Sequence, residues 1–181
     1  MILGLDISTS CTGWSIISPL TGELISQNYI HLSKLKDTFK KAELVMHNLK
    51  KINEKYDITN VFVEENLQMF RPGLSSAKTL ITLARFNGMV SLLSYQVFDI
   101  EPQFLNVNFA RKSVGLKIDK KDKTRTTKEK VLSWVSNEVT FEWPTKILKS
   151  GPRKGLQVYE PGCYDIADAY VIALAGYKNS K

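Results

Sequence analysis

The stretch that decides the fold is Met1-Ile-Leu-Gly-Leu-Asp6-Ile-Ser8-Thr-Ser-Cys-Thr12-Gly13-Trp-Ser-Ile-Ile17. Its apolar run at residues 2–5 is typical of a buried strand, and Gly13 opens a second apolar run after small polar residues. The stretch therefore predicts a β-hairpin. Asp6 lies where the first strand ends, and a buried strand rarely holds a carboxylate unless it is paired or binds a metal. A second interpretation, that Asp6 caps the turn, stays open from this stretch alone.

Composition narrows the class of protein. The chain has 181 residues, 43% of them hydrophobic and 24% charged, which is typical of one globular domain. A formal charge of +7 favours a polyanionic partner, nucleic acid first. Two cysteines and two histidines without ligand spacing argue against a zinc site and a disulfide framework. No apolar run could span a membrane and no export signal is present, so we expect an intracellular, cytoplasmic protein.

Strand and helix patterns alternate through the first hundred residues. Two further strands are predicted at Glu23–Ile30 and Val61–Val63, and the second ends in Glu64-Glu65. Apolar residues at helical spacing predict helices over Leu35–Lys55 and Ala77–Leu93. A fifth short strand is expected at Val97–Ile100.

The remainder of the chain predicts helices separated by irregular segments. We expect a short helix within Leu105–Val114, and Thr126-Thr-Lys-Glu129 resembles a capping box that opens another helix. Residues 137–162 contain three prolines and three glycines and are expected to be irregular, with exposed aromatic residues. An apolar helix is predicted over Tyr164–Tyr177.

Basic residues gather between positions 111 and 130. Only Asp119, Asp122 and Glu129 oppose them, and a charge run by itself is often only a solvated, mobile loop. The overall charge favours contacts with nucleic-acid phosphates instead. The candidate DNA-binding residues here are Arg111, Lys112, Lys117, Lys120, Lys121, Lys123 and Arg125.

Four carboxylates form the candidate catalytic site. Asp6 and Glu64 end two apolar strands, while Asp165 and Asp168 are three residues apart and share one face of an apolar helix. Acidic residues in a first helical turn also favour the helix dipole. Buried like charges, however, need cations beside them, and an all-carboxylate set favours Mg²⁺ or Mn²⁺. Two such ions about 3.5–4 Å apart are a common device for in-line phosphodiester cleavage.

The motifs that carry these residues resemble, in order, those of the RuvC family of Holliday-junction resolvases within the RNase H-like superfamily, and its phage or viral members most. The resemblance covers nearly the whole chain. The matching stretches are Leu3–Ser8 with Thr12-Gly13, Val61–Glu64, Ser76-Ala77-Lys78 through Ala84-Arg85 to Gly88, and Tyr164–Ala169.

The resemblance implies an α/β fold, a mixed sheet of three antiparallel and two parallel strands flanked by helices, in a single nuclease domain over residues 1–181. It implies a Mg²⁺- or Mn²⁺-dependent endonuclease, with two ions per site, that cuts Holliday junctions and other branched DNA. It also implies a homodimer, for which the helix Ala77–Leu93 is the candidate contact. The implied metal ligands are Asp6, Glu64, Asp165 and Asp168.

The resemblance further assigns basic and aromatic positions. Lys128 takes the place of a lysine near the scissile phosphate, and Arg111 or Lys112 that of a second basic residue. Cellular members carry an aromatic wedge soon after the second acidic residue, where this chain has Leu67, with Met69 and Phe70 displaced. Phe70 and Arg71 are therefore candidate DNA contacts. Residues 137–162 form a longer insertion that could contact DNA arms.

Three other functions are consistent with parts of this pattern. The first hairpin also resembles the phosphate motif of sugar kinases and actin-like ATPases, but those need two such domains and 181 residues are too few. A non-catalytic branched-DNA binder need not keep all four acidic residues. A related nuclease acting on flaps or RNA–DNA hybrids would share every feature above.

Overall fold

In a computed structural model, which describes residues 1–65, 77–119 and 121–180, five strands form one mixed sheet. β2 (Cys11–Ile17) pairs antiparallel with both β1 (Ile2–Ile7) and β3 (Leu24–His31). β4 (Asn60–Glu64) lies parallel to β1, and β5 (Gln103–Leu105) lies parallel to β4. The strand order β3-β2-β1-β4-β5 confirms the predicted mixed sheet of three antiparallel strands and two parallel ones.

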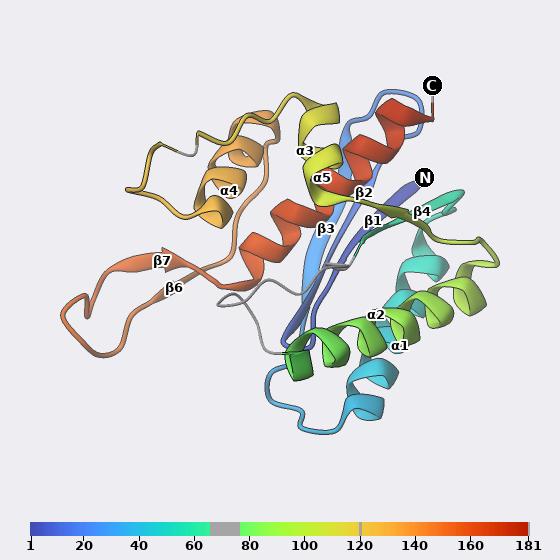
Figure 1. The fold of residues 1–181 in the computed structure, drawn as a ribbon, viewed down its shortest axis with the longest axis horizontal. Coiled ribbons are helices and arrows are strands. Elements are labelled where there is room, and N and C mark those ends of the chain that lie inside the picture. The colour runs from blue at the N-terminus through green and yellow to red at the C-terminus, as the bar shows by residue number, and fades with distance from the viewer. Residues whose placement is uncertain (66–76, 120, 181) are drawn as a thin grey trace.

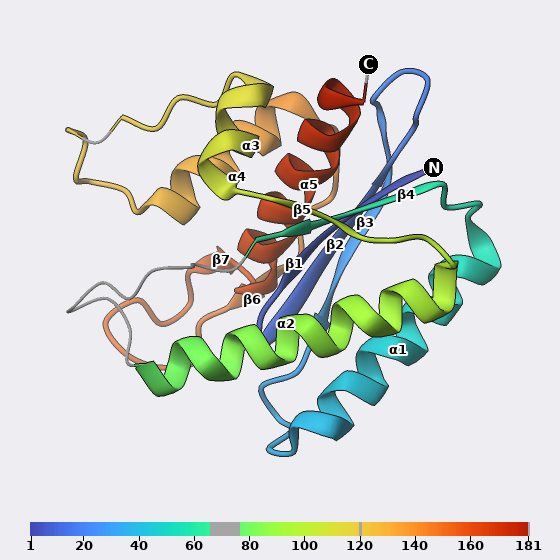
Figure 2. The ribbon, with the colours of Figure 1, turned by 45° about the vertical axis from the view of Figure 1, so that its right-hand side comes forward.

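Helices cover both faces of this sheet (Figures 1 and 2). α1 (Thr38–Lys55) and α2 (Ala77–Phe98) pack together on one face. α5 (Gly162–Asn179) crosses the other face, where α3 (Val107–Val114) and α4 (Thr127–Glu138) pack against it. The capping box predicted at Thr126 and Glu129 is present at the start of α4.

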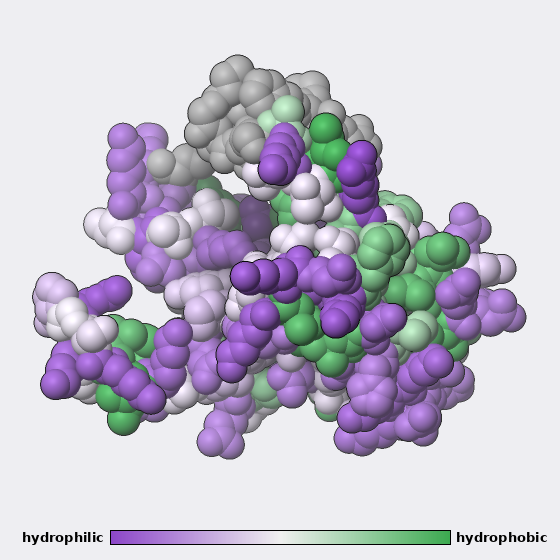
Figure 3. Space-filling view, turned by 90° about the horizontal axis from the view of Figure 1, so that it is seen from below, coloured by the Kyte–Doolittle hydropathy of each residue, from purple (hydrophilic) through white to green (hydrophobic). Residues whose placement is uncertain are grey.

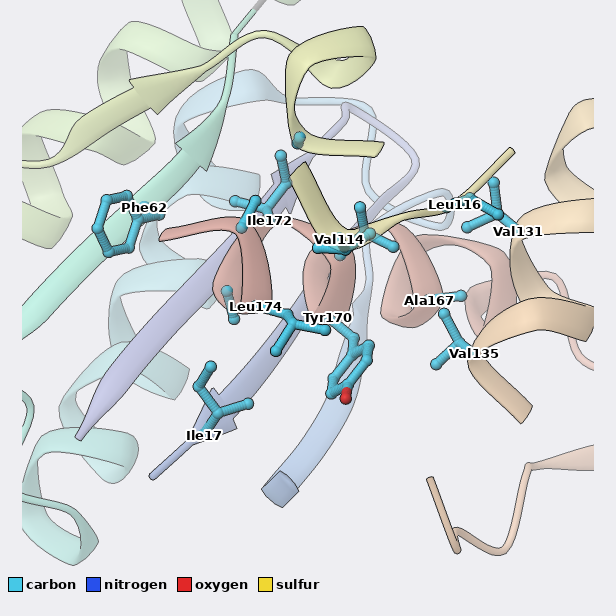
Figure 4. Packing of buried hydrophobic residues seen from close by; sticks show 14 of the residues in the cluster. Ile17, Phe62, Val114, Leu116, Val131, Val135, Ala167, Tyr170, Ile172 and Leu174 are labelled. Atoms are coloured by element: carbon cyan, nitrogen blue, oxygen red, sulfur yellow. The ribbon is translucent and has the colours of Figure 1, made fainter. Parts of the chain in front are cut away.

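The strands divide their side chains between two cores because successive residues point to opposite faces. On β1, Leu3 and Leu5 join the core beneath α1 and α2, while Ile2 joins the core around α5. The second core is drawn in Figure 4, where Tyr170 and Ile172 of α5 lie among residues of the sheet, α3 and α4. Asp6 is four residues beyond Ile2, so it points toward α5.

α5 lies unusually close to the first hairpin. A Cβ atom on Gly4 would collide with the Ala169 carbonyl oxygen, and one on Gly13 would collide with the Asp165 carbonyl group. Ser15 donates a 3.3 Å hydrogen bond to the Ile166 carbonyl oxygen from the same face of β2. These contacts fix the first turn of α5 against the end of the hairpin that carries Asp6.

The fifth strand is not where the sequence predicts it. Residues 97 and 98 continue α2, which ends at Phe98, and the next residue, Asp99, has a positive φ of 57°. β5 instead occupies Gln103–Leu105, after Pro102. A short β-branched and aromatic run such as Val97-Phe98 is compatible with a strand or a helix, and the packing of both residues against the α1 and α2 core favours the helix.

The segment 137–162 is also more ordered than predicted. It contains a two-stranded antiparallel hairpin formed by β6 (Thr145–Ile147) and β7 (Gln157–Tyr159). Of its predicted exposed aromatic residues, Tyr159 is exposed, whereas Phe141 and Trp143 are half-buried and stack edge-to-face. Three-residue strands are too short to show an alternating pattern, so the sequence predicts only an irregular segment here.

Some predicted positions lie outside the described residues. These are Leu67, Met69, Phe70, Arg71 and Lys120. In the part of the chain that the structure describes, no helix is both long and apolar enough to cross a membrane.

The close approach of α5 generates a stability prediction. Gly13→Ala is expected to lower the free energy of unfolding by roughly 1–3 kcal/mol or more, because the backbone of α5 would have to move away from the sheet. Urea unfolding followed by circular dichroism measures it.

The matched control is Gly88→Ala in α2, where an added Cβ would meet nothing within 4 Å. That substitution is expected to be neutral or to stabilise by up to about 1 kcal/mol, since alanine is the better helix former. Equal effects of the two substitutions would contradict the proposed contact.

Candidate active site

Two of the four carboxylates are delivered by neighbouring strands. Asp6 lies near the end of β1, and Glu64 is the last residue of β4. The parallel register pairs Leu5 with Val63, so Asp6 and Glu64 occupy the next position on each strand. Both point to the α5 face, because the preceding residues Leu5 and Val63 belong to the opposite core.

The other two carboxylates come from the first turns of α5. Asp165 and Asp168 are 8% and 5% exposed, which is unusual for aspartates. Gly13 is the β2 partner of Asp6, and it touches the Asp165 backbone. The hairpin that holds Asp6 therefore also receives the helix turn that holds the aspartate pair.

The four carboxylates lie close enough for their charges to act on one another. Burial raises the pKa of Asp6 well above its ordinary value, and the negative charges of the other three carboxylates raise it further. Burial likewise raises the pKa of Glu64 to about 7, with Asp168 adding to the shift. The pKa of Asp168 is raised by burial as well, although Arg111 opposes the shift.

Two basic side chains pair with the aspartates of α5. Lys128 Nζ, at the start of α4, lies 2.9 Å from Asp165 Oδ1. Arg111 Nη2, on α3, lies 3.1 Å from Asp168 Oδ1, and only 17% of the Arg111 side chain is exposed. Burial alone would lower the pKa of Lys128, but the charge and hydrogen bond of Asp165, together with the charges of Asp6 and Asp168, raise it overall. The helices packed on α5 thus supply counterions to the cluster.

The sequence left the second basic position open between Arg111 and Lys112. Arg111 contacts the carboxylate cluster, whereas Lys112 is exposed and forms no ion pair among the described residues; both line a cavity of about 380 Å³ with Lys117. Lys121, Lys123 and Arg125 are also exposed, on the segment between α3 and α4. That segment is braced rather than free, since Lys130 Nζ donates a 2.7 Å hydrogen bond to the Asp119 carbonyl oxygen.

One residue near the cluster was missed by sequence reasoning. Asn87, 3% exposed on α2, donates a 3.3 Å hydrogen bond from Nδ2 to the Glu64 carbonyl oxygen. Nothing in the sequence marks this asparagine, because its partner is a backbone atom from another element. Cys11 is also buried near the cluster, and burial, followed by the charge of Asp165, raises the pKa of its thiol.

The chemistry of the donor set fits a hard divalent cation. All four side chains are carboxylates, and carboxylate oxygens are the ligands that Mg²⁺ and Mn²⁺ prefer. Among the residues described, no three His, Cys, Asp or Glu side chains are arranged tightly enough to hold a metal ion as they stand. Beside Asp6 and Glu64 lies a cavity of about 190 Å³, which Ser8, Leu80 and Leu83 also line.

The raised carboxyl pKa values predict an unusual pH dependence. Glu64 has a pKa of about 7 in the folded protein and 4.5 in the unfolded chain, so between these pH values the folded state holds a proton that the unfolded state releases. The free energy of unfolding therefore falls as pH rises through that window. In EDTA, the melting temperature is expected to fall from pH 5 to pH 8. Glu64→Gln should remove part of this slope and raise the melting temperature at pH 8.

Differential scanning calorimetry across this range provides the measurement, and Glu101→Gln, at an exposed position, is the matched control. A melting temperature that rises from pH 5 to pH 8 in the unaltered protein would contradict the electrostatic picture.

Comparison with known proteins identifies the family to which the chain belongs. Residues 1–126 match the model of a family described as Lactococcus phage M3 protein, DUF3882. The chain belongs to this family. No curated protein matches the sequence.

Several solved structures of other proteins have a similar fold. RuvC of T. thermophilus in complex with a Holliday junction substrate aligns with a TM-score of 0.63 at 14% identity, over 99% of this chain and 93% of that one. The Thermus thermophilus RuvC structure gives 0.60 at 14% identity, over 99% and 94%. The yeast mitochondrial Holliday junction resolvase Ydc2 gives 0.56 at 15% identity, over 98% and 77%. The DUF3882 chain therefore has the RNase H-like fold of these resolvases.

Proposed function

We propose that this protein is a Mg²⁺-dependent endonuclease that cleaves Holliday junctions and other branched DNA by phosphodiester hydrolysis. The observation that carries the proposal is the cluster of four carboxylates at the junction of β1, β4 and α5, in which Asp165 and Asp168 are buried and Asp6 and Glu64 are partly buried. The shared fold with RuvC and Ydc2, one of them bound to a Holliday junction, supports the choice of substrate. We take residues 1–181 as one nuclease domain, and the family's description as a Lactococcus phage protein supports a phage-encoded enzyme.

In this proposal Asp6, Glu64, Asp165 and Asp168 hold two divalent cations, Mg²⁺ or Mn²⁺. Such ions supply an activated water and stabilisation of the leaving oxygen. The chain itself supplies a buried site in which carboxylates are held by packed elements rather than by loops. Burial of these groups raises the cost of leaving them unneutralised, so it strengthens their preference for cations.

In this proposal, Lys128 and Arg111 act on the scissile phosphate rather than on the metal ions. Each is positioned by a hydrogen-bonded carboxylate, and 55% of the Lys128 side chain is exposed. A cation at the mouth of the site can orient the scissile phosphate and neutralise charge that develops on it. The basic residues between α3 and α4 extend this positive surface toward the flanking DNA.

The direct test is cleavage of a synthetic four-way junction, with linear duplex, flap and RNA–DNA hybrid as comparison substrates. Paired nicks on opposed strands should require Mg²⁺ and disappear in EDTA. Asp6→Asn and Asp168→Asn should each lower the cleavage rate by roughly 100-fold or more while junction binding persists.

Asp99→Asn, at an exposed residue after α2, is the matched control and should cleave normally. Binding without cleavage under all conditions would favour a non-catalytic branched-DNA protein. Preferential cleavage of flaps or hybrids would keep the nuclease but change its substrate.

We also propose a homodimer that forms through α1 and α2. A groove of about 220 Å³ between them is lined mainly by apolar side chains, among them Phe39 and Leu92, which are 71% and 57% exposed. Figure 3, which views the molecule from below, shows hydrophobic and hydrophilic side chains interspersed on this surface. Two copies would place two sites on one junction, as paired cleavage requires.

The dimer prediction is tested by light scattering during gel filtration at micromolar concentration. The unaltered protein should have twice the mass of the 20.5 kDa chain, and Leu92→Glu should reduce it to the monomer mass because a charge would be buried in the contact. Leu20→Glu is the control, since Leu20 is 84% exposed in the turn between β2 and β3. A monomeric unaltered protein would rule the dimer out.

A further inference from the structure

The β6–β7 hairpin, residues 145–159, is a strongly basic element that no part of the site uses. It carries Lys146, Lys149, Arg153 and Lys154 and no acidic residue. None of its residues is buried, and within the described part of the chain none of these four cations forms an ion pair. Four like charges on one exposed hairpin repel one another, so they favour a polyanion as partner.

The hairpin is built as a fixed element rather than a loose loop. Beyond the two strands, hydrogen bonds link the Leu148 amide to the Leu156 carbonyl oxygen at 3.0 Å and the Gly155 amide to the Leu148 carbonyl oxygen at 2.9 Å. Gly151 and Gly155 both have positive φ, as the tight tip requires. The cations are therefore presented on ordered backbone, which reduces the entropy lost on binding.

The base of the hairpin is joined to the catalytic helix. The Glu160 amide donates a 2.9 Å hydrogen bond to the Pro144 carbonyl oxygen, and the Cys163 thiol donates one of 3.2 Å to the same oxygen. The Tyr29 hydroxyl of β3 donates to the Glu160 carboxylate, and the Tyr29 ring packs against Gly162 at the start of α5. Only a few residues separate this base from Asp165.

The hairpin and the basic segment between α3 and α4 project from the same side of the molecule in both ribbon views (Figures 1 and 2). Electrostatic contact supports this placement. The pKa of Glu129 on α4 is lowered chiefly by hydrogen bonds from Thr126, and the charge of Arg153 contributes as well. Two basic elements thus flank the end of α5 that carries the carboxylates.

We propose that the β6–β7 hairpin is a second DNA-binding element, which holds the phosphate backbone of a DNA arm beside the catalytic cluster. The choice of DNA as the polyanion rests on the proposed function. Backbone contacts by lysine and arginine do not read sequence, so the hairpin contributes affinity and orientation rather than base preference. A second copy of the chain is the less favourable occupant, because two such hairpins would bring eight positive charges together.

Apolar side chains on the hairpin are consistent with this partner. The β6–β7 register places Ile147 opposite Gln157 and Thr145 opposite Tyr159, so Ile147 and Tyr159 share one face. They are 66% and 45% exposed. Apolar contacts accompany the cations at many surfaces that bind DNA through its backbone and minor groove.

The test compares two variants that lose the same charge. In the hairpin variant, Lys146, Lys149, Arg153 and Lys154 are all changed to Gln. In the control variant, the exposed residues Lys36, Lys40, Lys50 and Lys51, in or just before α1, are changed to Gln. Binding to a four-way junction and to linear duplex is measured in EDTA from about 50 to 200 mM salt, so that no cleavage is needed.

The hairpin variant should bind junctions at least tenfold more weakly than the control variant at about 100 mM salt. Each lost phosphate contact lowers the slope of log affinity against log salt by about 0.9, so two to four contacts lower it by roughly 2–4. Both variants should keep the melting temperature of the unaltered protein, since the substituted residues are exposed.

The outcomes separate this inference from the proposed function. Equal binding and equal salt slopes for the two variants would overturn the hairpin inference, even if the unaltered protein cleaves junctions. Weaker DNA binding by the hairpin variant alone would sustain it, even if no branched DNA is cleaved. A lower oligomeric mass with unchanged DNA binding would identify a second copy as the occupant and overturn it.

Discussion

The structure depends on how closely α5 approaches the first hairpin. Gly4 and Gly13 leave room for the helix backbone, and no larger side chain fits at either position. Because β1 carries Asp6 two residues beyond Gly4, and α5 carries Asp165 where it touches Gly13, the same contact that closes the core also assembles the carboxylates. Folding and site formation are therefore one event, and a shift of the helix would disturb both.

The same packing has an electrostatic cost, because it brings the four carboxylates together. Asp165 and Asp168 are buried next to Asp6 and Glu64, a concentration of like charge that a core does not tolerate without compensation. Lys128 and Arg111 provide it from α4 and α3, the two helices whose apolar residues pack in one core with α5. The raised pKa of Glu64 shows that compensation is incomplete, and an incompletely neutralised carboxylate cluster is well suited to bind divalent cations.

The two faces of the sheet separate two tasks. The face of α5 carries every candidate catalytic group and both basic elements, whereas the face of α1 and α2 carries exposed apolar residues such as Phe39 and Leu92. A partner bound to one face leaves the other accessible. This division follows from the period of two in β1 and β4, which sends Leu3, Leu5 and Val63 to one core and Asp6 and Glu64 toward the other.

The sequence by itself determined the sheet's main strands, the long helices and the four acidic residues, because each is marked by a local pattern: an apolar run that ends in a carboxylate, or an acidic pair three residues apart in an apolar helix. Only the tertiary structure shows that Arg111, and not Lys112, pairs with a carboxylate of the cluster. It also shows that Asn87 donates a hydrogen bond to the Glu64 carbonyl oxygen, and that α2 continues through Val97 and Phe98. It also revealed the β6–β7 hairpin, whose three-residue strands are too short for a periodic signal. In each case the deciding interaction joins residues far apart in the chain, and periodicity and composition contain no information about such pairs.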